Sequence, residues 1–316
     1  MKAAVRSKYG SPEVLSINEV DTPTPKDSEV LVKVHATTVN RTDCHILTGM
    51  PFFMRFFTGL FKPRLSITGT DFAGQIEAIG KNVTEFKAGD KVIGFDFLGL
   101  QSHAHYLAVS ETKISLMPGN ITYDQAAACV EGAYYALNVI NKLHPKTAQK
   151  ALVNGATGAI GSAIVQFFKY YGTYVTAVCG SENTDLIQLL GADKLIDYRT
   201  NDFTKDNDSY DFVFDAVGKS TFRKCKQLLK KEGIYASSGG PNPVFVLITP
   251  LLGGKKEIFA PPKDLKRCLT LIKELVERGS FRPVIDREYP IDKIAEAYQY
   301  VATGQKIGNV IIAMDT

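Results

Sequence analysis

The chain has 316 residues, of which 45% are hydrophobic and 22% charged, and these values are typical of a globular protein with roughly two domains. Its formal net charge is only +4, and Lys and Arg are scattered among Asp and Glu, which argues against a nucleic-acid partner or an anionic membrane partner. We therefore expect a small-molecule ligand.

Five cysteines are spread singly along the chain without a Cys-x-x-Cys pair, which favours a reducing compartment over a disulfide scaffold or a zinc ribbon. The first residues lack the hydrophobic core of a signal peptide, and no apolar run reaches the roughly 18 residues of a membrane helix. We expect a cytoplasmic protein with no membrane partner.

Residues 1–120 carry short β-type runs, such as 30–34 and 91–94, which are separated by Pro, Gly and Asp turn signals. This pattern predicts a β-rich, barrel-like first domain. Its most apolar segment, residues 51–61, is too short to span a bilayer. Two interpretations of this segment remain open: a core or oligomer-contact segment, or a hydrophobic flap over a substrate pocket.

From residue 121 to 262, helices alternate with strands. A helix is expected over residues 122–141, with Thr122 as its N-cap. Further helices are expected over 159–171, up to Leu190 and over 220–231, and strands over 151–153, 174–178, 195–197, 212–214 and 234–237. This alternation predicts a parallel sheet built from right-handed crossovers, and therefore a doubly wound α/β second domain.

Residues 263–316 follow a different pattern. An amphipathic helix over 264–278 is followed by a short β-run at 284–285, a helix over 291–302 and a last β-run over 309–313. This closing strand is isolated from the parallel unit and is closer in character to the first domain. We therefore expect residues 263–316 to return to the first domain.

A glycine-rich turn, Asn154-Gly-Ala-Thr-Gly-Ala-Ile-Gly161, follows the strand at 151–153 and opens the next helix. Because glycine lacks a Cβ, these positions allow a tight turn, a close approach of the backbone to a pyrophosphate and close packing of helix on strand. The helix N-terminus adds free N–H groups and the positive end of its dipole. The motif stands in the strand, turn and helix context that it requires, so we predict a dinucleotide site here.

The choice between NADH and NADPH depends on the end of the second strand. NAD-selective sites place an Asp or Glu there, about 20 residues beyond the glycines, but this chain has Cys179 and Gly180. These small residues leave room for a 2′-phosphate, and Arg199 could supply a positive charge, whereas Glu182 opposes it. We expect NADPH as the cofactor, with NADH as the alternative.

Several motifs then carry a resemblance to a known family. They are Val39-Asn-Arg-Thr-Asp43, Gly69-Thr-Asp-Phe-Ala-Gly74, the run from Ile79 to Gly94, Leu190-Gly-Ala-Asp193, Phe214-Asp-Ala-Val-Gly218 and Arg282-Pro-Val-Ile-Asp286. In these motifs and their order, the chain resembles the medium-chain dehydrogenases/reductases, and in particular their zinc-free quinone oxidoreductase-like branch. The resemblance implies an α/β protein with a GroES-like β-barrel domain formed by both chain ends, a Rossmann doubly wound parallel-sheet domain between them, and a homodimer.

The predicted cofactor-binding residues lie in the glycine turn and after the following strands of the Rossmann domain. They are Gly155, Ala156, Thr157, Gly158, Ala159, Ile160, Gly161, Cys179, Gly180, Ser181, Asn183, Tyr198, Arg199, Val217, Ser238 and Gly239.

The resemblance also implies a chain without catalytic zinc. Where the zinc alcohol dehydrogenases of the superfamily have a Cys and a His ligand, this chain has Asn40 and Thr70, and neither replaces a thiolate or an imidazole well. No four-Cys cluster for a structural zinc follows Gly94. We interpret His103 and His105 as a surface strand pair rather than as metal ligands, and we expect no metal site.

Without a metal, reduction requires hydride delivery from nicotinamide C4 to an electrophilic carbon, with hydrogen bonds that stabilise the developing oxyanion or enolate. By resemblance, Asn40 lies near the nicotinamide and the substrate. Asp43, in the same motif, is either catalytic or a structural residue of the loop. Tyr135 falls where the branch often has a Thr, so it either donates a hydrogen bond or a proton or packs in its helix. Glu131 is interpreted as an acid that favours the first turn of a helix.

The expected function is an NAD(P)H-dependent, zinc-independent transfer of hydride to a quinone, an enone or a related carbonyl compound. Two alternatives remain open: a zinc-independent alcohol dehydrogenase, and a non-catalytic NADPH-binding protein. Tyr289 and Lys293 match the Tyr-x-x-x-Lys pair of another dehydrogenase chemistry, but Pro290 and their distance from the nucleotide domain favour chance.

Overall fold

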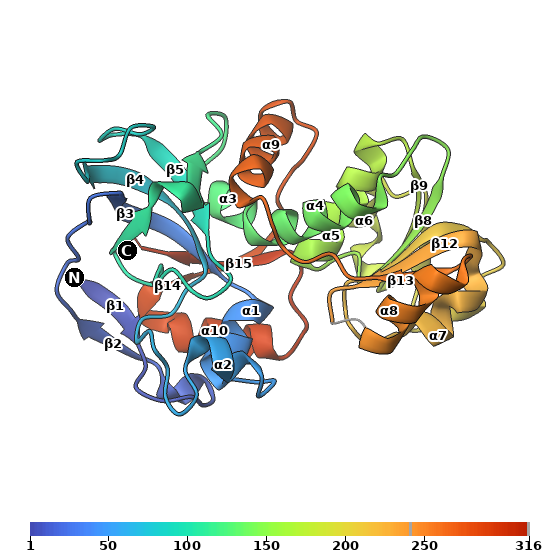
Figure 1. The fold of residues 1–316 in the computed structure, drawn as a ribbon, viewed down its shortest axis with the longest axis horizontal. Helices are drawn as coiled ribbons and strands as arrows, with labels where there is room; N and C mark the ends of the chain where they lie inside the picture. The colour runs from blue at the N-terminus through green and yellow to red at the C-terminus, as the bar shows by residue number, and fades with distance from the viewer. Residues whose placement is uncertain (240–241, 315–316) are drawn as a thin grey trace. The chain divides into compact units, whose positions relative to one another are not determined.

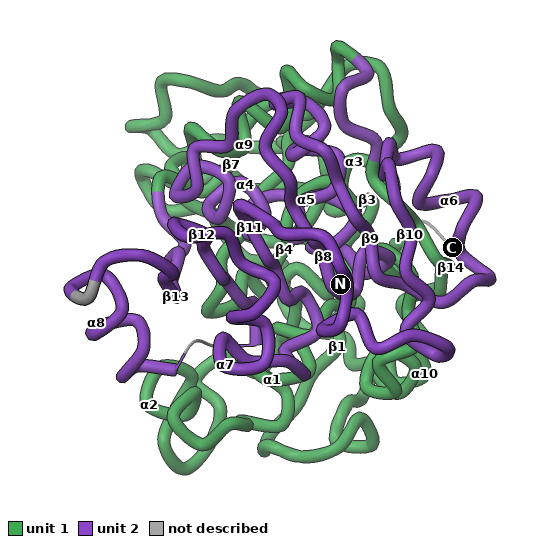
Figure 2. Tube along the Cα trace, turned by 90° about the vertical axis from the view of Figure 1, so that its right-hand side faces the viewer, with its two compact units in different colours: residues 1–131, 264–278, 283–316 green, residues 132–263, 279–282 purple. Residues whose placement is uncertain are grey.

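The computed structural model describes residues 1–239 and 242–314, which belong to two compact units (Figure 1, Figure 2). Unit 1 contains residues 1–131, 264–278 and 283–316, and unit 2 contains residues 132–263 and 279–282. The predicted first domain ends at residue 120, whereas the first segment of unit 1 continues to residue 131. The additional residues include helix α3 (Tyr123–Ala128), whose buried alanines lie against strands of unit 1.

A seven-stranded sheet is the main sheet of unit 1. Its strands lie in the order β14 (Ile285–Pro290), β15 (Asn309–Ala313), β3 (Glu29–Val39), β4 (Asp71–Ile79), β5 (Lys91–Phe95) and β7 (Ile114–Leu116), and β6 (Tyr106–Ser110) also pairs with β3. The first half of β3 pairs with β6 and its second half pairs with β15. The closing strand therefore completes the first domain, as the sequence predicts.

Side chains in the first part of β3 alternate between buried and half-buried, as expected for a strand with one face on the core, whereas residues 36–39 at its end are all buried. Val30, Val32 and Val34 are buried in one apolar cluster with Phe72 and Ile76 of β4. A smaller two-stranded sheet pairs β1 (Lys2–Val5) with β2 (Ser16–Glu19). The helices of unit 1 besides α3 include α1 (Arg41–Thr48), α2 (Met54–Thr58), α9 (Leu265–Glu277) and α10 (Ile294–Ala302).

Unit 2 contains a parallel six-stranded sheet. Its strands lie in the order β10 (Lys194–Asp197), β9 (Tyr174–Cys179), β8 (Lys150–Asn154), β11 (Tyr210–Asp215), β12 (Leu229–Ser237) and β13 (Lys256–Ile258), with every pairing parallel. Numbered along the chain, this is the 3-2-1-4-5-6 order of a Rossmann fold. The connecting helices are α5 (Ala159–Tyr170), α6 (Thr184–Leu189), α7 (Phe222–Cys225) and α8 (Pro243–Leu252), and α4 (Glu131–Leu143) precedes the sheet in sequence.

The helix expected over residues 122–141 is two helices, α3 and α4. The amides of Cys129 and Val130 donate to Ala126 and Ala127, three residues back, and this tighter bonding ends α3.

The helix expected over residues 220–231 is also shorter than predicted. A 3-10 turn (Lys226–Leu228) follows α7, and β12 already begins at Leu229, which is buried. Helix α8 and strand β13 were not expected from the sequence. Pro250 lies inside α8, and a proline is ordinarily a sign against a helix. Within the described ranges, no helix is long and apolar enough to cross a membrane.

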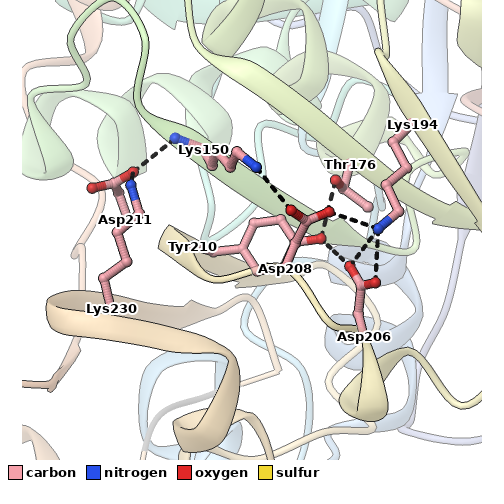
Figure 3. A network of polar contacts seen from close by, with 8 residues as sticks. All are labelled: Lys150, Thr176, Lys194, Asp206, Asp208, Tyr210, Asp211 and Lys230. Carbon is pink, nitrogen blue, oxygen red and sulfur yellow. Dashed lines mark hydrogen bonds and ion pairs between the residues drawn. The ribbon is translucent and has the colours of Figure 1, made fainter.

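A network of ion pairs joins the starts of several strands of unit 2 (Figure 3). Lys194 Nζ lies 2.7 Å from carboxylate oxygens of both Asp206 and Asp208, and Lys150 Nζ lies 2.8 Å from Asp208. Tyr210 OH donates to Asp206. Strands β8, β10 and β11 begin at Lys150, Lys194 and Tyr210, so the network lies at the N-terminal ends of these parallel strands. The glycine turn lies at the opposite, C-terminal end of β8.

Candidate functional site

The glycine turn connects β8 to α5, and its glycines serve different steric purposes. Gly155 has a φ of 77°, and a Cβ there would collide with Val217. A Cβ on Gly161 would collide with the carbonyl oxygen of Gly155, because the helix packs closely on the turn. At Gly158, in contrast, the nearest atom to a Cβ would be Gly155 O at 3.8 Å. The turn therefore leaves open space at Gly158.

The N-terminus of the twelve-residue helix α5 begins at this open space. Gly158 is its N-cap and has no side chain to cap it, and the first bond of the helix runs from Ser162 N to Gly158 O at 2.8 Å. The amides of Ala159, Ile160 and Gly161 precede that bond, so they have no carbonyl partner within the helix. Free amides and the positive end of the helix dipole fit the pyrophosphate of a dinucleotide.

Asp215, the last residue of β11, ties this turn to the neighbouring loop. Its buried carboxylate accepts from Asn154 Nδ2 at 3.0 Å and from the amides of Val217, Gly218 and Ser220 at 3.0, 3.1 and 2.7 Å. Hydrogen bonds to a charged group are the stronger kind, so this carboxylate fixes both loops. In the sequence, Asp215 stands out only as part of the motif Phe214-Asp-Ala-Val-Gly218. The available signal was an acid at a strand end, three residues before a glycine.

The predicted residues after β11 and β12 approach one another. Ser238 N donates to Asp215 O at 3.0 Å, and Ser238 Oγ donates to Ala216 O at 2.9 Å. A Cβ on Gly239 would collide with Gly218. Unit 2 therefore brings the predicted residues after these two strands next to the loop that Asp215 fixes.

The end of β9 carries the residues expected to select the cofactor. Cys179 is buried, and Gly180 starts a short turn in which Asn183 N donates to Gly180 O at 3.0 Å; Ser181 in this turn is exposed. Arg199 Nη2 lies 2.6 Å from Glu182 Oε1, and both side chains are about half exposed. Arg199, expected to favour a 2′-phosphate, and Glu182, expected to oppose it, therefore form an ion pair with each other.

Tyr198 lies between the strand end and this ion pair. Its amide donates to Cys179 O at 3.3 Å, and the Arg199 guanidinium lies 5.7 Å from the centre of its ring. The ring itself is 56% exposed, which leaves it accessible to a planar ligand group.

In unit 1, Asn40 and Asp43 belong to a buried polar cluster. Asn40 N donates to Asp43 Oδ2 at 2.8 Å, and Thr70 Oγ1 donates to Asp43 Oδ1 at 3.1 Å. Thr70 Oγ1 also lies 3.4 Å from Glu131 Oε2, and Thr42 donates to the other carboxylate oxygen of Glu131. Both oxygens of Asp43 are thus occupied within the cluster, which is the geometry of a residue that holds the loop.

The cluster continues from Asn40 to a second acid. Asn40 Nδ2 donates to Thr38 Oγ1 at 2.7 Å, and Thr38 donates to both oxygens of Asp71, from its hydroxyl at 2.7 Å and from its amide at 2.9 Å. Burial and the nearby Glu131 raise the pKa of Asp71 to about 7. Burial, together with Glu131 and Asp71, raises the pKa of Asp43 well above its ordinary value.

Glu131, Asp71 and Lys306 are the residues of this cluster whose role the sequence did not reveal. Burial raises the pKa of Glu131, while hydrogen bonds from Thr42 and Asn40 and the charge of Lys306 oppose the rise. Burial lowers the pKa of Lys306 to about 8. A lone acid in the apolar first turn of α4 was the signal for Glu131. Lys306, in contrast, comes from a segment more than 170 residues away along the chain, so no local pattern could indicate it.

Tyr135 lies on α4 and belongs to unit 2, whereas Asn40 and Asp43 belong to unit 1. Its side chain is half-buried, and its ring lies 5.8 Å from the ring of Tyr134. The structure brings Asn40 and Asp43 into contact, and it gives Tyr135 at least one packing neighbour within its own helix.

His103 is not a surface residue, so the expectation of a surface strand pair is wrong for it. Its side chain is fully buried, with Nε2 2.9 Å from Thr38 O and Nδ1 2.8 Å from Thr68 Oγ1. Because a carbonyl only accepts, Nε2 donates to Thr38 and Nδ1 accepts from Thr68. Burial lowers the pKa of His103 to about 4, and its hydrogen bonds are those of a neutral core histidine.

The aromatic segment 51–61 is mostly exposed. Phe52, Phe53, Phe56 and Phe57 are 54–62% exposed, and Phe61 is 90% exposed. The core interpretation is therefore wrong for these side chains, while the oligomer-contact and flap interpretations stay predictions.

Among residues 1–239 and 242–314, no group of three or more His, Cys, Asp or Glu side chains could hold a metal ion. The Thr70 hydroxyl, at one of the two ligand positions of the zinc enzymes, is instead a donor to Asp43.

Comparison with known families and proteins covers nearly the whole chain. Residues 26–140 match the family described as alcohol dehydrogenase GroES-like domain, and residues 190–312 match the family described as zinc-binding dehydrogenase. The human mitochondrial NAD(P)H oxidoreductase RTN4IP1 is 31% identical over 99% of this chain and 89% of its own length. The chloroplast envelope quinone oxidoreductase homolog of Arabidopsis thaliana is 30% identical over 93% of this chain and 92% of its own length.

Solved structures of other proteins have the same fold as this chain. The quinone oxidoreductase from Coxiella burnetii superposes with a TM-score of 0.88, at 24% identity and over 99% of both chains. Three findings lead to the same family assignment: the strand order of unit 2, the C-terminal strand that completes the sheet of unit 1, and the relatives named above. The chain belongs to the medium-chain dehydrogenase/reductase superfamily, in its quinone oxidoreductase-like branch.

Proposed function

We propose that this protein is an NADPH-dependent, zinc-independent oxidoreductase that transfers hydride to a quinone, an enone or a related carbonyl compound. The observation that carries this proposal is the glycine turn at the N-terminus of α5, with its open space at Gly158. The printed names of relatives support the substrate class. One is a quinone oxidoreductase of Pongo abelii, and another is an NADPH-dependent alkenal/one oxidoreductase of Arabidopsis thaliana, each 29% identical to this chain.

The predicted cofactor-binding residues fit a dinucleotide. Residues 155–161 would hold the pyrophosphate, because the amides of Ala159, Ile160 and Gly161 have no carbonyl partner within α5 and a Cβ at Gly158 would fill the space that a phosphate needs. Val217, Ser238 and Gly239 would line the remainder of the dinucleotide site. When bound, the cofactor supplies a hydride from C4 of its nicotinamide ring.

The preference for NADPH rests on Arg199. A guanidinium suits a phosphate better than a hydroxyl, and Tyr198 beside it offers a planar face to the adenine. Arg199 must leave Glu182 to bind a 2′-phosphate, since their ion pair is 2.6 Å long. Because both side chains are half exposed, this exchange costs little free energy, about 0–1 kcal/mol for a surface ion pair.

Asn40 and Tyr135 are the residues that we propose act on the substrate. One of the two N–H groups of the Asn40 amide donates to Thr38, and the other is within reach of Glu131. Asn40 would exchange the Glu131 acceptor for a substrate oxygen on which negative charge develops. The Tyr135 hydroxyl would supply a further hydrogen bond or a proton. Asp43 is a positioning residue, because it holds the Asn40 backbone.

Zinc independence is supported by chemistry at the ligand positions. Asn40 and Thr70 stand where relatives have a Cys and a His, and an amide and a hydroxyl are poor zinc ligands. Both side chains already make hydrogen bonds within the cluster.

The proposal extends to the assembly and the compartment. We expect a homodimer, and the exposed apolar face of α8, where Leu247 and Leu251 are 71% and 85% exposed, supports self-association. Light scattering after size-exclusion chromatography measures this directly. The cytoplasmic location stays a prediction, because the relatives include proteins named mitochondrial and chloroplastic.

The experiment that tests the function follows NADPH oxidation by its absorbance, with a panel of quinones, enones and aldehydes. We expect turnover of at least one apolar quinone or enone. NADPH binding without turnover of any panel member would favour the non-catalytic binding protein. Reduction of NADP+ by alcohols, without reduction of the panel, would favour an alcohol dehydrogenase.

Gly158→Asp tests the cofactor site in the same assay. An aspartate would set a negative charge against the phosphates at the α5 N-terminus, so NADPH binding should be lost. Gly158→Ala is the matched control for folding, because its Cβ would have no atom closer than 3.8 Å. Unchanged NADPH affinity in Gly158→Asp would refute this placement of the cofactor.

A further inference from the structure

Arg6 is a buried cation without an acidic partner. It follows β1 directly and is 3% exposed. Its Nη1 donates to the carbonyl oxygen of Ile46, whereas its Nε is buried and has no hydrogen-bond partner. In the part of the chain that the structure describes, no carboxylate forms an ion pair with it. An unpaired charge is expensive to bury, so its retention at this place calls for an explanation.

The charge of the acidic residue Asp43 acts on Arg6, but it does not provide the ion-pair partner that Arg6 lacks. Asp43 acts on Arg6 only through its charge, at a distance beyond an ion pair, and both oxygens of Asp43 already accept from Asn40 and Thr70. The Tyr9 ring lies 5.3 Å from the guanidinium and can stabilise a cation in part. Burial is the largest influence on Arg6, and it lowers the pKa of the guanidinium.

Arg6 lines a cavity of about 210 Å³ within unit 1. The other walls are mainly apolar and include Phe57, Leu65 and Leu98, and Arg64 adds a second cation. No acidic residue lines this cavity.

The hydroxyls in the cavity wall already have partners. Thr58 Oγ1 contacts Tyr9 OH at 2.8 Å and donates to Met54 O, and Thr68 Oγ1 contacts His103 Nδ1 at 2.8 Å. The buried Nε of Arg6 is therefore a hydrogen-bond donor without a partner on a residue that lines this cavity, and the exposed Arg64 lines it as well.

The volume and the chemistry of the cavity select a class of ligand. A cavity of about 150 Å³ is known to accept benzene, so this cavity has room for a body of that size and a carboxylate. It is smaller than the pockets of about 300–1,000 Å³ that hold drug-sized ligands. The Nε edge of a guanidinium presents two parallel N–H donors, which match the two oxygens of a carboxylate. A tetrahedral phosphate would need more donors than this largely apolar wall provides.

We propose that this cavity is a binding site for a small organic carboxylate, whose charged group pairs with the Nε edge of Arg6 and whose apolar body packs against Phe57, Leu65 and Leu98. The site goes beyond the proposed reductase function, because Arg6, Leu65 and Leu98 are not among the residues assigned to the cofactor or to hydride transfer, although Phe57 belongs to the aromatic segment 51–61. Its test needs neither NADPH nor a quinone.

Titration calorimetry of the full chain with benzoate tests the proposal, and benzamide serves as the neutral counterpart of similar shape. We expect benzoate to bind and benzamide to bind at least about tenfold more weakly, since a charge-assisted hydrogen bond contributes about 1.5–3 kcal/mol. Arg6→Met should weaken benzoate binding by about ten- to a hundredfold, and Arg6→Lys should restore part of it. Arg267→Met, at an exposed arginine of α9, is the matched control and should bind benzoate as the unaltered chain does.

A second variant covers the case in which Arg6→Met does not fold. Leu98→Trp fills the cavity and keeps Arg6, so it should abolish benzoate binding and leave the thermal midpoint of the ligand-free chain within a few degrees. The proposal is overturned by benzoate affinity that is unchanged in Arg6→Met or Leu98→Trp, by equal affinity for benzamide, or by the absence of benzoate binding. Inorganic phosphate that competes as strongly as benzoate would overturn the assignment to carboxylates.

Discussion

At the scale of single residues, the roles of glycines could be predicted from the sequence more fully than the roles of acidic residues. Gly155, Gly158 and Gly161 were predicted because the need for a missing Cβ is visible in the residue itself. Asp215 was recognised only as part of a motif, because its role depends on Asn154, a donor 61 residues away. Glu131 lies in the first turn of α4, as interpreted from the sequence, but its contact with Thr42, 89 residues earlier, could not be predicted.

The Arg199–Glu182 ion pair leads to a prediction about cofactor choice. Arg199→Ala should lower kcat/KM with NADPH by about tenfold and leave kcat/KM with NADH nearly unchanged, because the lost hydrogen bond is made only to a 2′-phosphate. Glu182→Gln should raise kcat/KM with NADPH, because Arg199 no longer has a competing acid. Steady-state kinetics with both cofactors measure these effects. An equal loss with NADH and NADPH would remove Arg199 from the 2′-phosphate site.

The buried neutral His103 makes stability depend on pH. Its pKa is about 4 when folded and about 6.5 when unfolded, so the unfolded chain binds more protons between these values. The contribution of His103 to the free energy of unfolding is complete above pH 6.5 and is lost as the pH falls from 6.5 towards 4. Between pH 7 and pH 5, the loss due to His103 should be about 2 kcal/mol.

Urea unfolding at pH 7 and pH 5 tests this effect. His103→Gln should show a smaller loss of stability between the two pH values than the unaltered chain does. His144→Gln, at an exposed histidine, is the control and should show the full loss. A His103→Gln chain with the same pH dependence as the control would mean that His103 is not neutral and buried in solution.

At the scale of secondary-structure elements, the strands of the parallel sheet were predicted better than the helices around them. Short apolar runs between turn signals are characteristic of buried strands, and β8 to β12 lie where such runs were found. The division of α3 from α4 could not be predicted, since residues 122–141 contain neither Pro nor a mid-helix break signal other than Gly132. Helix α8 was missed because it is apolar over most of its length and contains Pro250.

The ion-pair network at the starts of the strands provides a prediction at this scale (Figure 3). Hydrogen bonds from Lys150 and Lys194 lower the pKa of Asp208 to about 2. Its contribution to stability is therefore present above about pH 4 and is lost as the pH falls towards 2. Asp208→Asn should reduce the free energy of unfolding by about 1 kcal/mol at pH 7, since these groups are partly exposed and screened.

Chemical denaturation at pH 7 and pH 2.5 measures this difference. The deficit of Asp208→Asn should shrink at the lower pH, because Asp208 is then largely protonated in the unfolded chain and only partly protonated in the folded chain. Asp21→Asn, at an exposed position of unit 1, is the control and should lose little at either pH. A deficit of equal size at both pH values would show that the ion pairs do not stabilise the sheet.

At the scale of the whole molecule, the fold class could be predicted from the sequence as a β-rich domain and a doubly wound α/β domain. The change from β-runs to alternating helices and strands near residue 121, and the isolated last strand, indicated a domain formed by both chain ends. The predicted boundary at residue 120 differs from the end of the first segment of unit 1, because α3 belongs to unit 1 although its Ala-rich sequence resembles the start of the second domain. The buried cluster of unit 1 combines residues from four separate segments, and this kind of long-range assembly leaves no local signature.

Zinc independence is a prediction about the complete enzyme. Prolonged treatment with a zinc chelator, followed by its removal, should leave kcat/KM with NADPH and a quinone within about twofold, because Asn40 and Thr70 are poor zinc ligands. Metal content measured in parallel confirms that any zinc has been removed. Activity that is lost on chelation and restored by zinc would contradict the proposed chemistry.

The proposed function depends on direct delivery of the hydride of NADPH to a carbon atom of the substrate. The most direct measurement uses NADPH that carries deuterium at C4 and an apolar enone, with mass spectrometry of the product. We expect one deuterium atom, bound to carbon, in each product molecule when the labelled face of the nicotinamide is the reactive one, and none when the opposite face is labelled. A reduced product that carries no deuterium with either labelled face, or NADPH that binds without any product being formed, would contradict it.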